Sequence, residues 1–322
     1  MKAMLIKALG KDLELTDIMK PDLYENAILV RVVATSLNFA DTLLIEGKYQ
    51  EMPKLPFAPG MEICGIVEEV GLKVTNFEKG DKVLSLVGYG GLAEFIAPLA
   101  SQCIKIPKNL PSIEVATLMI AYGTSELALN YKAKLKPKEN LLVLGAAGGV
   151  GLTAVEIGKI MGARIIAVAN GTEKCDFLRR IGAHEVIDSN QPDLINTIKK
   201  LGGADVIYDP IGGRMFDIAL KVANKEARLV PIGFASGEIP QIPANILLVK
   251  NVTVIGFYIS AYRHFKQKIL LDCLTRLIDM HSQNLIKPYV SNIFSLDQTN
   301  EAINLIKNRM STGKVVIKLS DD

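Results

Sequence analysis

A glycine-rich turn carries the most specific chemistry in the sequence. It reads Gly-Ala-Ala-Gly-Gly-Val-Gly over 145–151, after an apolar run and before a stretch with helical periodicity. Such a turn leaves backbone N–H groups free at a helix N-terminus, where the helix dipole favours a pyrophosphate. Against the GxGxxG pattern of dinucleotide sites the three positions are Ala146, Gly148 and Gly151, so the first glycine is replaced. The expected dinucleotide contacts are Ala147, Gly148, Gly149, Val150 and Gly151.

The end of the next strand indicates which dinucleotide binds. That strand is expected to end at Ala169, where NAD-binding proteins place an acidic residue on the ribose 2′-hydroxyl. The sequence continues Asn-Gly-Thr-Glu-Lys174, with no carboxylate at the strand tip. Lys174 can pair with a 2′-phosphate, and Asn170 is the second expected contact, so NADPH is the expected cofactor. Glu173 leaves NAD open, and Lys174 could instead be an ordinary solvated helix residue.

The elements around this turn follow an α/β pattern. From about Leu118, short apolar runs alternate with amphipathic stretches of helical length, which is typical of a doubly wound parallel sheet. The six expected strands are 141–144, 164–169, 185–188, 205–208, 228–232 and 252–256. The glycine turn therefore follows the first strand of a six-stranded Rossmann-type domain.

The remaining chain predicts a second, mostly β domain. Its expected strands, separated by turn residues, are 27–34, 64–70, 81–87 and 92–96. The tail predicts a helix at 262–282, a strand at 289–294, a helix at 296–310 and a strand at 314–319. These closing strands have no partner in the parallel sheet, so we expect them to return to the first unit. The expected domains are 1–118 with 264–322, and 119–263.

Composition excludes several classes of function. The 322 residues are 49% hydrophobic, and 37 basic against 34 acidic residues give a net charge of +3, which is too weak and dispersed for nucleic-acid binding. The four cysteines form no CxxC pair, so no zinc knuckle or disulfide framework is expected. With no signal peptide and no membrane span, we expect a cytoplasmic protein. Pairing of the edge strand at 251–256 with its own copy predicts a homodimer.

Several spaced motifs resemble one protein family. They are Asn38-Phe-Ala-Asp41, Gly47-Lys-Tyr49, Pro56-Phe-Ala-Pro-Gly-Met-Glu62-Ile-Cys-Gly65, Gly80-Asp-Lys-Val83 and Gly90-Gly-Leu-Ala-Glu94, together with the glycine turn. Over essentially the whole chain they resemble the quinone oxidoreductase branch of the medium-chain dehydrogenase/reductase superfamily. The resemblance implies a GroES-like catalytic domain built from both ends of the chain, with the Rossmann domain inserted.

The same comparison predicts a site without metal. Zinc-dependent members place a cysteine near Asn38 and a His-Glu pair where this chain has Met61-Glu62. They also often carry a run of four cysteines, which is missing here. A thioether is a poor replacement for imidazole at zinc, so we expect no metal.

The resemblance also assigns residues to catalysis and cofactor binding. Asn38 could donate its amide to an acceptor oxygen, Tyr49 could donate a proton, and Asp41 would position them. Alternatively, Asn38 satisfies a turn and Tyr49 only lines the site. Further cofactor contacts are expected at Thr124 and at the strand ends, at Ile211, Gly233, Phe234, Phe257 and Tyr258. Two departures from the family, Ile45 for an arginine and Glu126 for an aromatic residue, bear on substrate and cofactor details. His184, His264 and His281 receive no role.

The leading hypothesis is therefore an NADPH-dependent oxidoreductase that reduces a small-molecule quinone or α,β-unsaturated carbonyl. One alternative is an enoyl-CoA or enoyl-ACP thioester reductase with Tyr49 as proton donor and a basic entrance at Lys48, Lys54, Arg263 and Lys266. A second alternative is a non-catalytic dinucleotide-binding, stress or RNA-binding protein. The dispersed charge makes RNA binding the weakest of the three.

Overall fold

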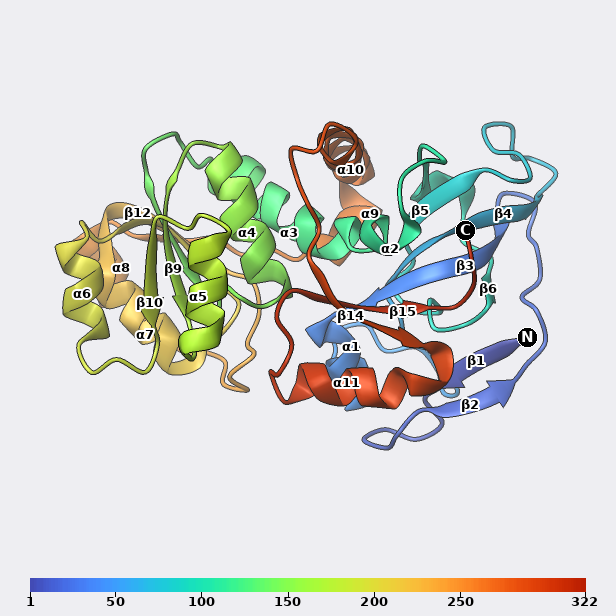
Figure 1. Cartoon of the computed structure of the whole chain (residues 1–322), viewed down its shortest axis with the longest axis horizontal. Helices are drawn as coiled ribbons and strands as arrows, with labels where there is room; N and C mark the ends of the chain where they lie inside the picture. Colours follow the sequence, from blue (N-terminus) through green and yellow to red (C-terminus); the bar gives the residue numbers. More distant parts are fainter. The chain divides into compact units, whose positions relative to one another are not determined.

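Short aliphatic and β-branched runs form two separate sheets, as the sequence predicts. The computed structural model describes all 322 residues. They divide into a β-rich unit, Met1–Ala121 with Ser260–Asp322, and a parallel-sheet unit, Tyr122–Ile259 (Figure 1). The β-rich unit is thus assembled from both ends of the chain.

The β-rich unit contains a seven-stranded sheet in the order β14-β15-β3-β4-β5-β7, with β6 paired to β3. The strands are β3 (Ile28–Leu37), β4 (Glu62–Val70), β5 (Lys82–Leu86), β6 (Phe95–Ile96), β7 (Cys103–Lys105), β14 (Val290–Ser295) and β15 (Lys314–Lys318). A separate antiparallel hairpin joins β1 (Lys2–Leu5) to β2 (Glu14–Asp17). The sheet core includes Ile28, Val30, Val32, Ile63 and Val67, all fully buried.

The end of the chain returns to this sheet. Strand β15 pairs antiparallel with β3, with Val315 opposite Leu37 and Lys318 opposite Ala34. The prediction that the closing strands leave the parallel sheet is confirmed. This pairing places Lys314, the first residue of β15, beside the end of β3, where the candidate catalytic residues begin.

Helices complete the β-rich unit. They are α1 (Phe39–Ile45), η1 (Ala100–Gln102), α2 (Ser112–Val115), η2 (Leu118–Tyr122, whose last residue belongs to the other unit), η4 (Ile259–Ala261, which starts there), α9 (Tyr262–Phe265), α10 (Gln267–Ser282), η5 (Leu296–Gln298) and α11 (Thr299–Lys307). Helix α1 starts directly after β3 and contacts α11 (Figure 1). The helix predicted at 262–282 is interrupted, because Lys266 has the non-helical angles φ −145° and ψ 48°.

The parallel-sheet unit has six strands in the order β10-β9-β8-β11-β12-β13, all parallel. The strands are β8 (Asn140–Leu144), β9 (Arg164–Ala169), β10 (Glu185–Asp188), β11 (Ala204–Asp209), β12 (Ala223–Pro231) and β13 (Thr253–Val254). This order runs outward from β8 in both directions, so the predicted doubly wound Rossmann-type sheet is confirmed. The edge strand β13 contains only two residues and is shorter than the predicted strand at 252–256.

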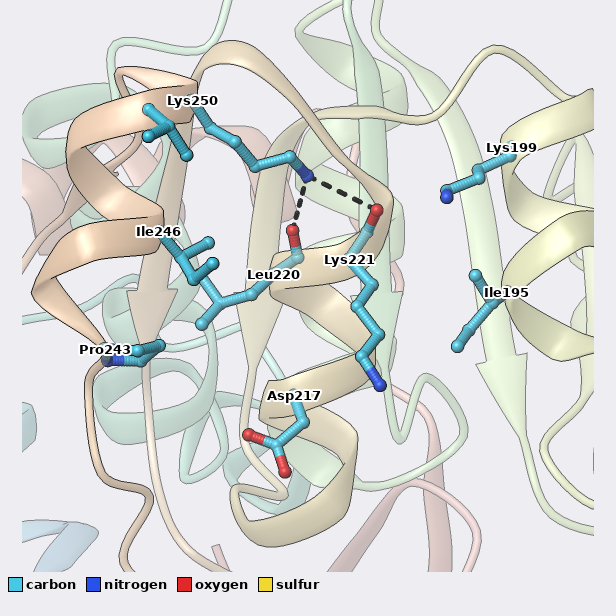
Figure 2. Close-up of a pocket in the computed structure, with 9 residues that line it drawn as sticks. Ile195, Lys199, Asp217, Leu220, Lys221, Pro243, Ile246 and Lys250 are labelled. Carbon is cyan, nitrogen blue, oxygen red and sulfur yellow. Dashed lines mark hydrogen bonds between the residues drawn. The ribbon is translucent and has the colours of Figure 1, made fainter.

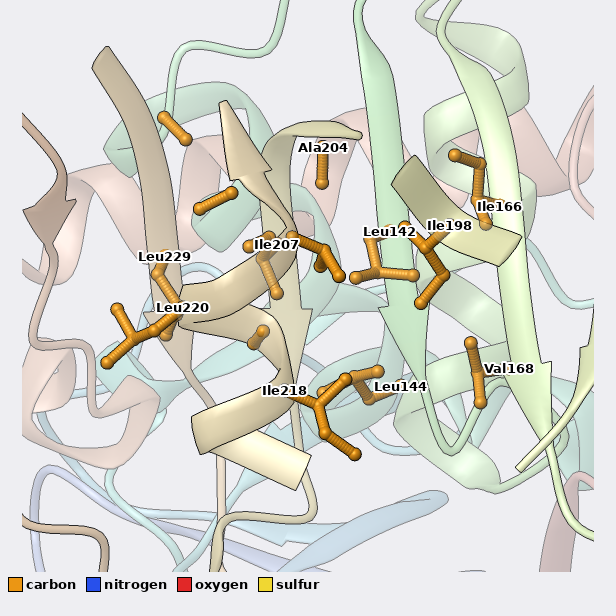
Figure 3. Packing of buried hydrophobic residues seen from close by; sticks show 14 of the residues in the cluster. Leu142, Leu144, Ile166, Val168, Ile198, Ala204, Ile207, Ile218, Leu220 and Leu229 are labelled. Atoms are coloured by element: carbon orange, nitrogen blue, oxygen red, sulfur yellow. The ribbon is translucent and has the colours of Figure 1, made fainter. Parts of the chain in front are cut away.

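Helices cover both faces of this sheet. They are α3 (Gly123–Glu126), η3 (Leu127–Lys132), α4 (Gly149–Ile160), α5 (Thr172–Arg180), α6 (Leu194–Lys200), α7 (Gly213–Val222) and α8 (Ala244–Lys250). Helices α4 and α5 lie on one face, and α6, α7 and α8 on the other (Figure 1). The core beneath α6 and α7 includes Leu142, Ile166 and Ile207 (Figure 3), and all three are fully buried. Phe216 of α7 is fully buried in the same core. Because the central strands β8 and β9 are buried on both faces, they read in the sequence as continuous apolar runs.

The sequence did not predict the hairpin of β1 and β2 or the short strand β7. Between them, these strands have few consecutive apolar residues, and β2 shows a mostly exposed burial pattern. No helix in the chain is both long enough and apolar enough to cross a membrane.

Candidate functional site

The glycine turn lies where β8 meets α4, as expected. The first helical hydrogen bond of α4 runs from the Leu152 amide to the Gly148 carbonyl at 2.9 Å. The amides of Gly149, Val150 and Gly151 precede that bond, so they are the unpaired N-terminal donors of a 12-residue helix. Three converging N–H groups with the positive end of the helix dipole form a site suited to a phosphate anion.

The three glycines at 145, 148 and 151 are present for different structural reasons. Gly145 has a φ of +59°, a conformation that residues with a side chain rarely adopt. A Cβ on Gly151 would overlap the Gly145 carbonyl oxygen and lie 2.8 Å from Ala146 Cα. A Cβ on Gly148 would meet only the Gly145 oxygen, at 3.4 Å. Gly151 is therefore required by packing, whereas the space beside Gly148 is open for a ligand.

The tip of β9 carries no carboxylate. Asn170 follows the strand, and its Oδ1 accepts a hydrogen bond from Asn190 Nδ2 at 2.8 Å. Gly171, with a φ of +89°, then turns the chain into α5. Lys174 lies in the first turn of α5 and is half-buried; burial lowers the pKa of its ammonium, while Glu173 opposes that shift. An ammonium and an amide therefore both lie close to this strand tip.

The other expected cofactor residues lie in the same unit. Ile211 follows β11, Gly233 and Phe234 follow β12, and Phe257 and Tyr258 follow β13. Since the carboxyl ends of parallel strands share one edge, these positions fall on the edge that carries the glycine turn. Thr124 is a buried residue of α3.

Asp209 shapes the turn after β11. Its Oδ1 accepts hydrogen bonds from the amides of Ile211 at 2.9 Å and Gly212 at 3.0 Å, and burial raises the pKa of its carboxyl. The Ile211 side chain in turn borders Gly145, because a Cβ there would lie 2.7 Å from Ile211 Cδ1. Asp209 is not among the predicted site residues; it supports the glycine turn from the neighbouring strand β11.

In the β-rich unit, Asp41 fixes the start of α1. Its two oxygens accept hydrogen bonds from the amides of Asn38, at 2.8 Å, and Gly60, at 3.0 Å. The side chain is fully buried, and this burial raises the carboxyl pKa to about 6, although the two backbone bonds and the charge of Lys314 oppose the shift. Asp41 therefore ties the strand end holding Asn38 to the segment before β4, in agreement with a positioning role.

The Asn38 carboxamide is held on both sides. Nδ2 donates to Glu62 Oε1 at 2.8 Å and to the Ser36 carbonyl at 3.2 Å, and Oδ1 accepts from Lys314 Nζ at 2.6 Å. Both amide hydrogens are thus already used inside the protein. Asn38 can donate to an acceptor only if the longer bond, to Ser36, is exchanged.

Glu62 and Lys314 are the two residues of this cluster that the site prediction did not include. Glu62 is fully buried and also accepts hydrogen bonds from the Ile120 amide, at 2.8 Å, and from the Ser36 hydroxyl. Lys314 is 4% exposed, and its Nζ lies 3.6 Å from Glu62 Oε1. In the sequence, a lysine at the start of an apolar run is typical of a solvated strand end. Only the structure, in which the Lys314 side chain points inward, shows that it belongs to this cluster.

Tyr49 lies on the segment between α1 and β4 and is half-buried. The same segment is anchored two residues further on, where Glu51 accepts a hydrogen bond from Arg263 at 3.1 Å. Arg263 also donates to the Val87 carbonyl at 3.0 Å, and its side chain is only 10% exposed. The salt bridge therefore restrains the segment that carries Tyr49.

Comparison with known proteins decides the family. Residues 24–108 match the alcohol dehydrogenase GroES-like domain, and residues 149–276 match the zinc-binding dehydrogenase family. A quinone oxidoreductase-like protein 2 homolog from Nematostella vectensis is 41% identical over 98% of this chain and 88% of its own length. The chain belongs to the quinone oxidoreductase branch of the medium-chain dehydrogenase/reductase superfamily.

Solved structures of this branch have the same fold. The Escherichia coli quinone oxidoreductase, crystallised with NADPH, gives a TM-score of 0.93 at 25% identity and covers 99% of this chain and 100% of its own. The Thermus thermophilus quinone oxidoreductase, whose complex with NADPH is also known, gives 0.86 at 31% identity, with coverage of 99% and 100%. The expected GroES-like and Rossmann-type architecture of this branch is thus confirmed.

One of the two matching families is named for zinc binding, but the side chains at the expected ligand positions of this chain do not fit zinc. No group of three or more His, Cys, Asp and Glu side chains lies close enough together to hold a metal ion. At the expected ligand positions stand the amide of Asn38 and the buried thioether of Met61. The Lys314 ammonium, in addition, already supplies a positive charge beside Glu62.

A cavity of about 480 Å³ in the parallel-sheet unit contains none of the predicted site residues (Figure 2). It lies over α7, between α6 and α8, and its apolar lining includes Leu220 and Ile246. Lys250 at its rim donates hydrogen bonds to the carbonyls of Leu220, at 2.7 Å, and Ala223, at 2.9 Å. Those carbonyls end α7, so Lys250 has a structural role as a cap. This cavity therefore forms no part of the predicted cofactor or acceptor site.

Proposed function

We propose that this chain is an NADPH-dependent, zinc-independent reductase that transfers a hydride to a quinone or an α,β-unsaturated carbonyl compound. One observation carries the proposal: the free N-terminal amides of α4 follow β8, while the neighbouring strand β9 ends without a carboxylate and leads to Lys174. The first feature suits a pyrophosphate and the second a 2′-phosphate. The NADPH complexes of the two solved relatives support the same cofactor.

Residues of the parallel-sheet unit would hold the cofactor. The amides of Gly149, Val150 and Gly151 would donate to the pyrophosphate, and Lys174 with Asn170 would bind the 2′-phosphate. The open space beside Gly148 allows the backbone to approach a phosphate closely. When bound, NADPH supplies the hydride.

Residues of the β-rich unit would stabilise the charge that develops on the acceptor oxygen. Asn38 would donate the Nδ2 hydrogen that it now donates to the Ser36 carbonyl, with 3.2 Å between Nδ2 and that oxygen, and Tyr49 would donate its hydroxyl proton. Asp41 holds the backbone beneath Asn38 and does not itself reach solvent. The misfit between zinc and the set formed by Asn38, Met61 and Lys314 supports a mechanism that relies on hydrogen-bond donors alone.

Arg263 argues against the enoyl-thioester alternative. That alternative requires free basic side chains at the entrance to the acceptor site, which would bind a CoA phosphate or an acidic carrier protein. Arg263 is instead held by Glu51 and the Val87 carbonyl. A quinone or a small enone needs no such entrance, so we favour those acceptors.

Steady-state NADPH oxidation with a panel of acceptors tests the proposal. We expect turnover with 1,4-quinones or small enones, unaffected by a chelator, and less than stoichiometric zinc in the purified protein. Lys174→Met should weaken NADPH binding about tenfold or more, equivalent to about 1.4 kcal/mol, and leave NADH binding unchanged. Lys200→Met, at an exposed position at the end of α6, is the matched control.

Three results would change the conclusion. The absence of turnover with every acceptor would reject the enzyme assignment. Loss of activity on chelation would reject zinc independence. Enoyl-CoA turnover that Tyr49→Phe abolishes while quinone rates stay intact would establish the thioester reductase instead.

We also propose a cytoplasmic homodimer. Strand β13 lies at the sheet edge and pairs only with β12, so its second side can accept a copy of itself. All four cysteines are buried and none forms a disulfide, as suits a reducing compartment. Light scattering after size-exclusion chromatography should give twice the chain mass of 35.0 kDa, and a monomer would refute the dimer.

A further inference from the structure

The cluster around Lys314 has a feature that the proposed reaction leaves unexplained. Burying an ammonium is costly unless its hydrogen bonds and charge are satisfied, yet Lys314 is 4% exposed. Its Nζ donates to the Leu37 carbonyl at 3.0 Å and to Asn38 Oδ1 at 2.6 Å. A buried cation therefore ends on the amide that we propose as a donor.

The chemistry of the neighbours fixes how the Asn38 amide is oriented. An ammonium can only donate, so the amide oxygen must face Lys314; Glu62 Oε1 accepts the hydrogen bond from Asn38 Nδ2 at 2.8 Å, so the amide nitrogen faces Glu62. The bond from Lys314 is charge-assisted and short, which makes this orientation strongly preferred. Without Lys314, the Asn38 oxygen would lose the donor that holds it.

The cation also changes the donor strength of the amide. A positive charge on the carbonyl oxygen draws electron density from the nitrogen, so the N–H groups become better hydrogen-bond donors. The resemblance puts zinc ligands of other members near Asn38 and at Met61-Glu62. In this chain the buried ammonium of Lys314 bonds to Asn38 at 2.6 Å and lies 3.6 Å from Glu62 Oε1.

We propose that Lys314 is a positioning residue of the acceptor site, whose ammonium orients and polarises the Asn38 carboxamide. The expected effect on kcat rests on the proposed function, whereas the orientation of the Asn38 amide by Lys314 does not. Asp41 and Glu62 are the acidic groups that face this ammonium, and Asp41 reaches it only through space. Lys314 thus acts through Asn38 and needs no contact with substrate.

The test compares Lys314→Met with Lys318→Met in the full-length protein. Lys318 is the matched control because it lies on the same strand with a half-exposed side chain, paired to Asp321 at the surface. We expect Lys314→Met to lower kcat about tenfold to a hundredfold, as for loss of a transition-state donor, with KM for NADPH little changed. Lys318→Met should stay close to wild type.

A second readout does not depend on activity. In protein labelled with 15N-asparagine, the Asn38 side-chain amide, assigned through Asn38→Ser, should exchange slowly with D2O in wild type and Lys318→Met. In Lys314→Met it should exchange much faster and shift. If Lys314→Met fails to fold, the double variant Lys314→Met/Glu62→Gln removes both partner charges and should fold, but with the same low kcat and fast exchange.

The outcomes separate the two proposals. A folded Lys314 variant with wild-type Asn38 exchange, or one with wild-type kcat, overturns the positioning role. If the wild-type protein reduces no acceptor but the Asn38 exchange still depends on Lys314, the proposed function fails and the positioning of Asn38 stands.

Discussion

Gly148 and Gly151 of the glycine turn allow the effects of packing and of ligand binding to be tested separately. Gly151→Ala places a Cβ against backbone atoms of Gly145 and Ala146, at under 3 Å, and neither can move without shifting the turn. Gly148→Ala places its Cβ 3.4 Å from one oxygen, in open space. Gly148 has a φ of −78° and a ψ of 172°, which alanine adopts without strain.

The two substitutions should change the stability of the protein in different directions and by different amounts. Overpacking costs about 1–3 kcal/mol, and the helix propensity of alanine recovers up to about 1 kcal/mol, so Gly151→Ala should lose about 1 kcal/mol net. A loss of 1 kcal/mol lowers Tm by about 2–4 °C in a domain of this size, so we expect a decrease of about that amount. Gly148→Ala should keep or slightly raise Tm, because it reduces the entropy of the unfolded chain.

Dinucleotide affinity should follow a different pattern. The Gly148 Cβ would occupy the space that a pyrophosphate needs, so we expect NADPH to bind about tenfold more weakly in a protein of normal stability. Differential scanning fluorimetry without ligand gives Tm, and titration of NADPH fluorescence gives the dissociation constant. If Gly148→Ala melts as low as Gly151→Ala, or binds NADPH as tightly as wild type, the interpretation of this turn is wrong.

Three further predictions concern the two cores. Asp41 holds its proton more tightly in the folded state, with a pKa of about 6, so its contribution to stability falls as pH rises from about 4 through 6. The difference in Tm between wild type and Asp41→Asn should therefore narrow from pH 5 to pH 7.5, and a widening gap would contradict the shift. Tyr208→Phe removes a buried 3.0 Å hydrogen bond to Ser125 and should cost about 1 kcal/mol in urea unfolding; no change would mean the bond contributes nothing. Arg228→Met should cost about 2 kcal/mol and Glu139→Gln less, because Arg228 keeps its bond to a backbone carbonyl; the reverse order would contradict this.

The sequence was sufficient for the parallel sheet because local pattern and tertiary role agree there. Strands β9 and β10 begin and end at the predicted residues, since each is a short β-branched run bounded by turn residues; β9 is almost fully buried and the edge strand β10 is half-buried. The interruption at Lys266 was not predictable, because the residues on both sides keep helical periodicity and only tertiary packing selects the break. Periodicity alone likewise gave no sign of the hairpin of β1 and β2.

The proposed acceptor site was predictable only in part, because the contacts that hold Asn38 join residues remote in the sequence. Asn38 and Asp41 lie three residues apart, and a turn motif reports such a pair. Lys314 reaches Asn38 only because β15 pairs with β3, across 276 positions of sequence. No local pattern contains that contact, whereas the strand pairing makes it unavoidable.

The Lys314 contact changes what Asn38 can do. From the sequence, Asn38 could either donate its amide to an acceptor or satisfy groups at a turn. In the folded protein its hydrogens are shared between a carboxylate and a carbonyl, and its oxygen is bound to a cation. The weaker of its two donated bonds is the one a substrate oxygen can replace, and the ammonium favours that exchange most when the oxygen becomes negative. An arrangement of this kind gains little from a neutral ground state and more from a developing oxyanion, which is what hydride transfer to a carbonyl requires.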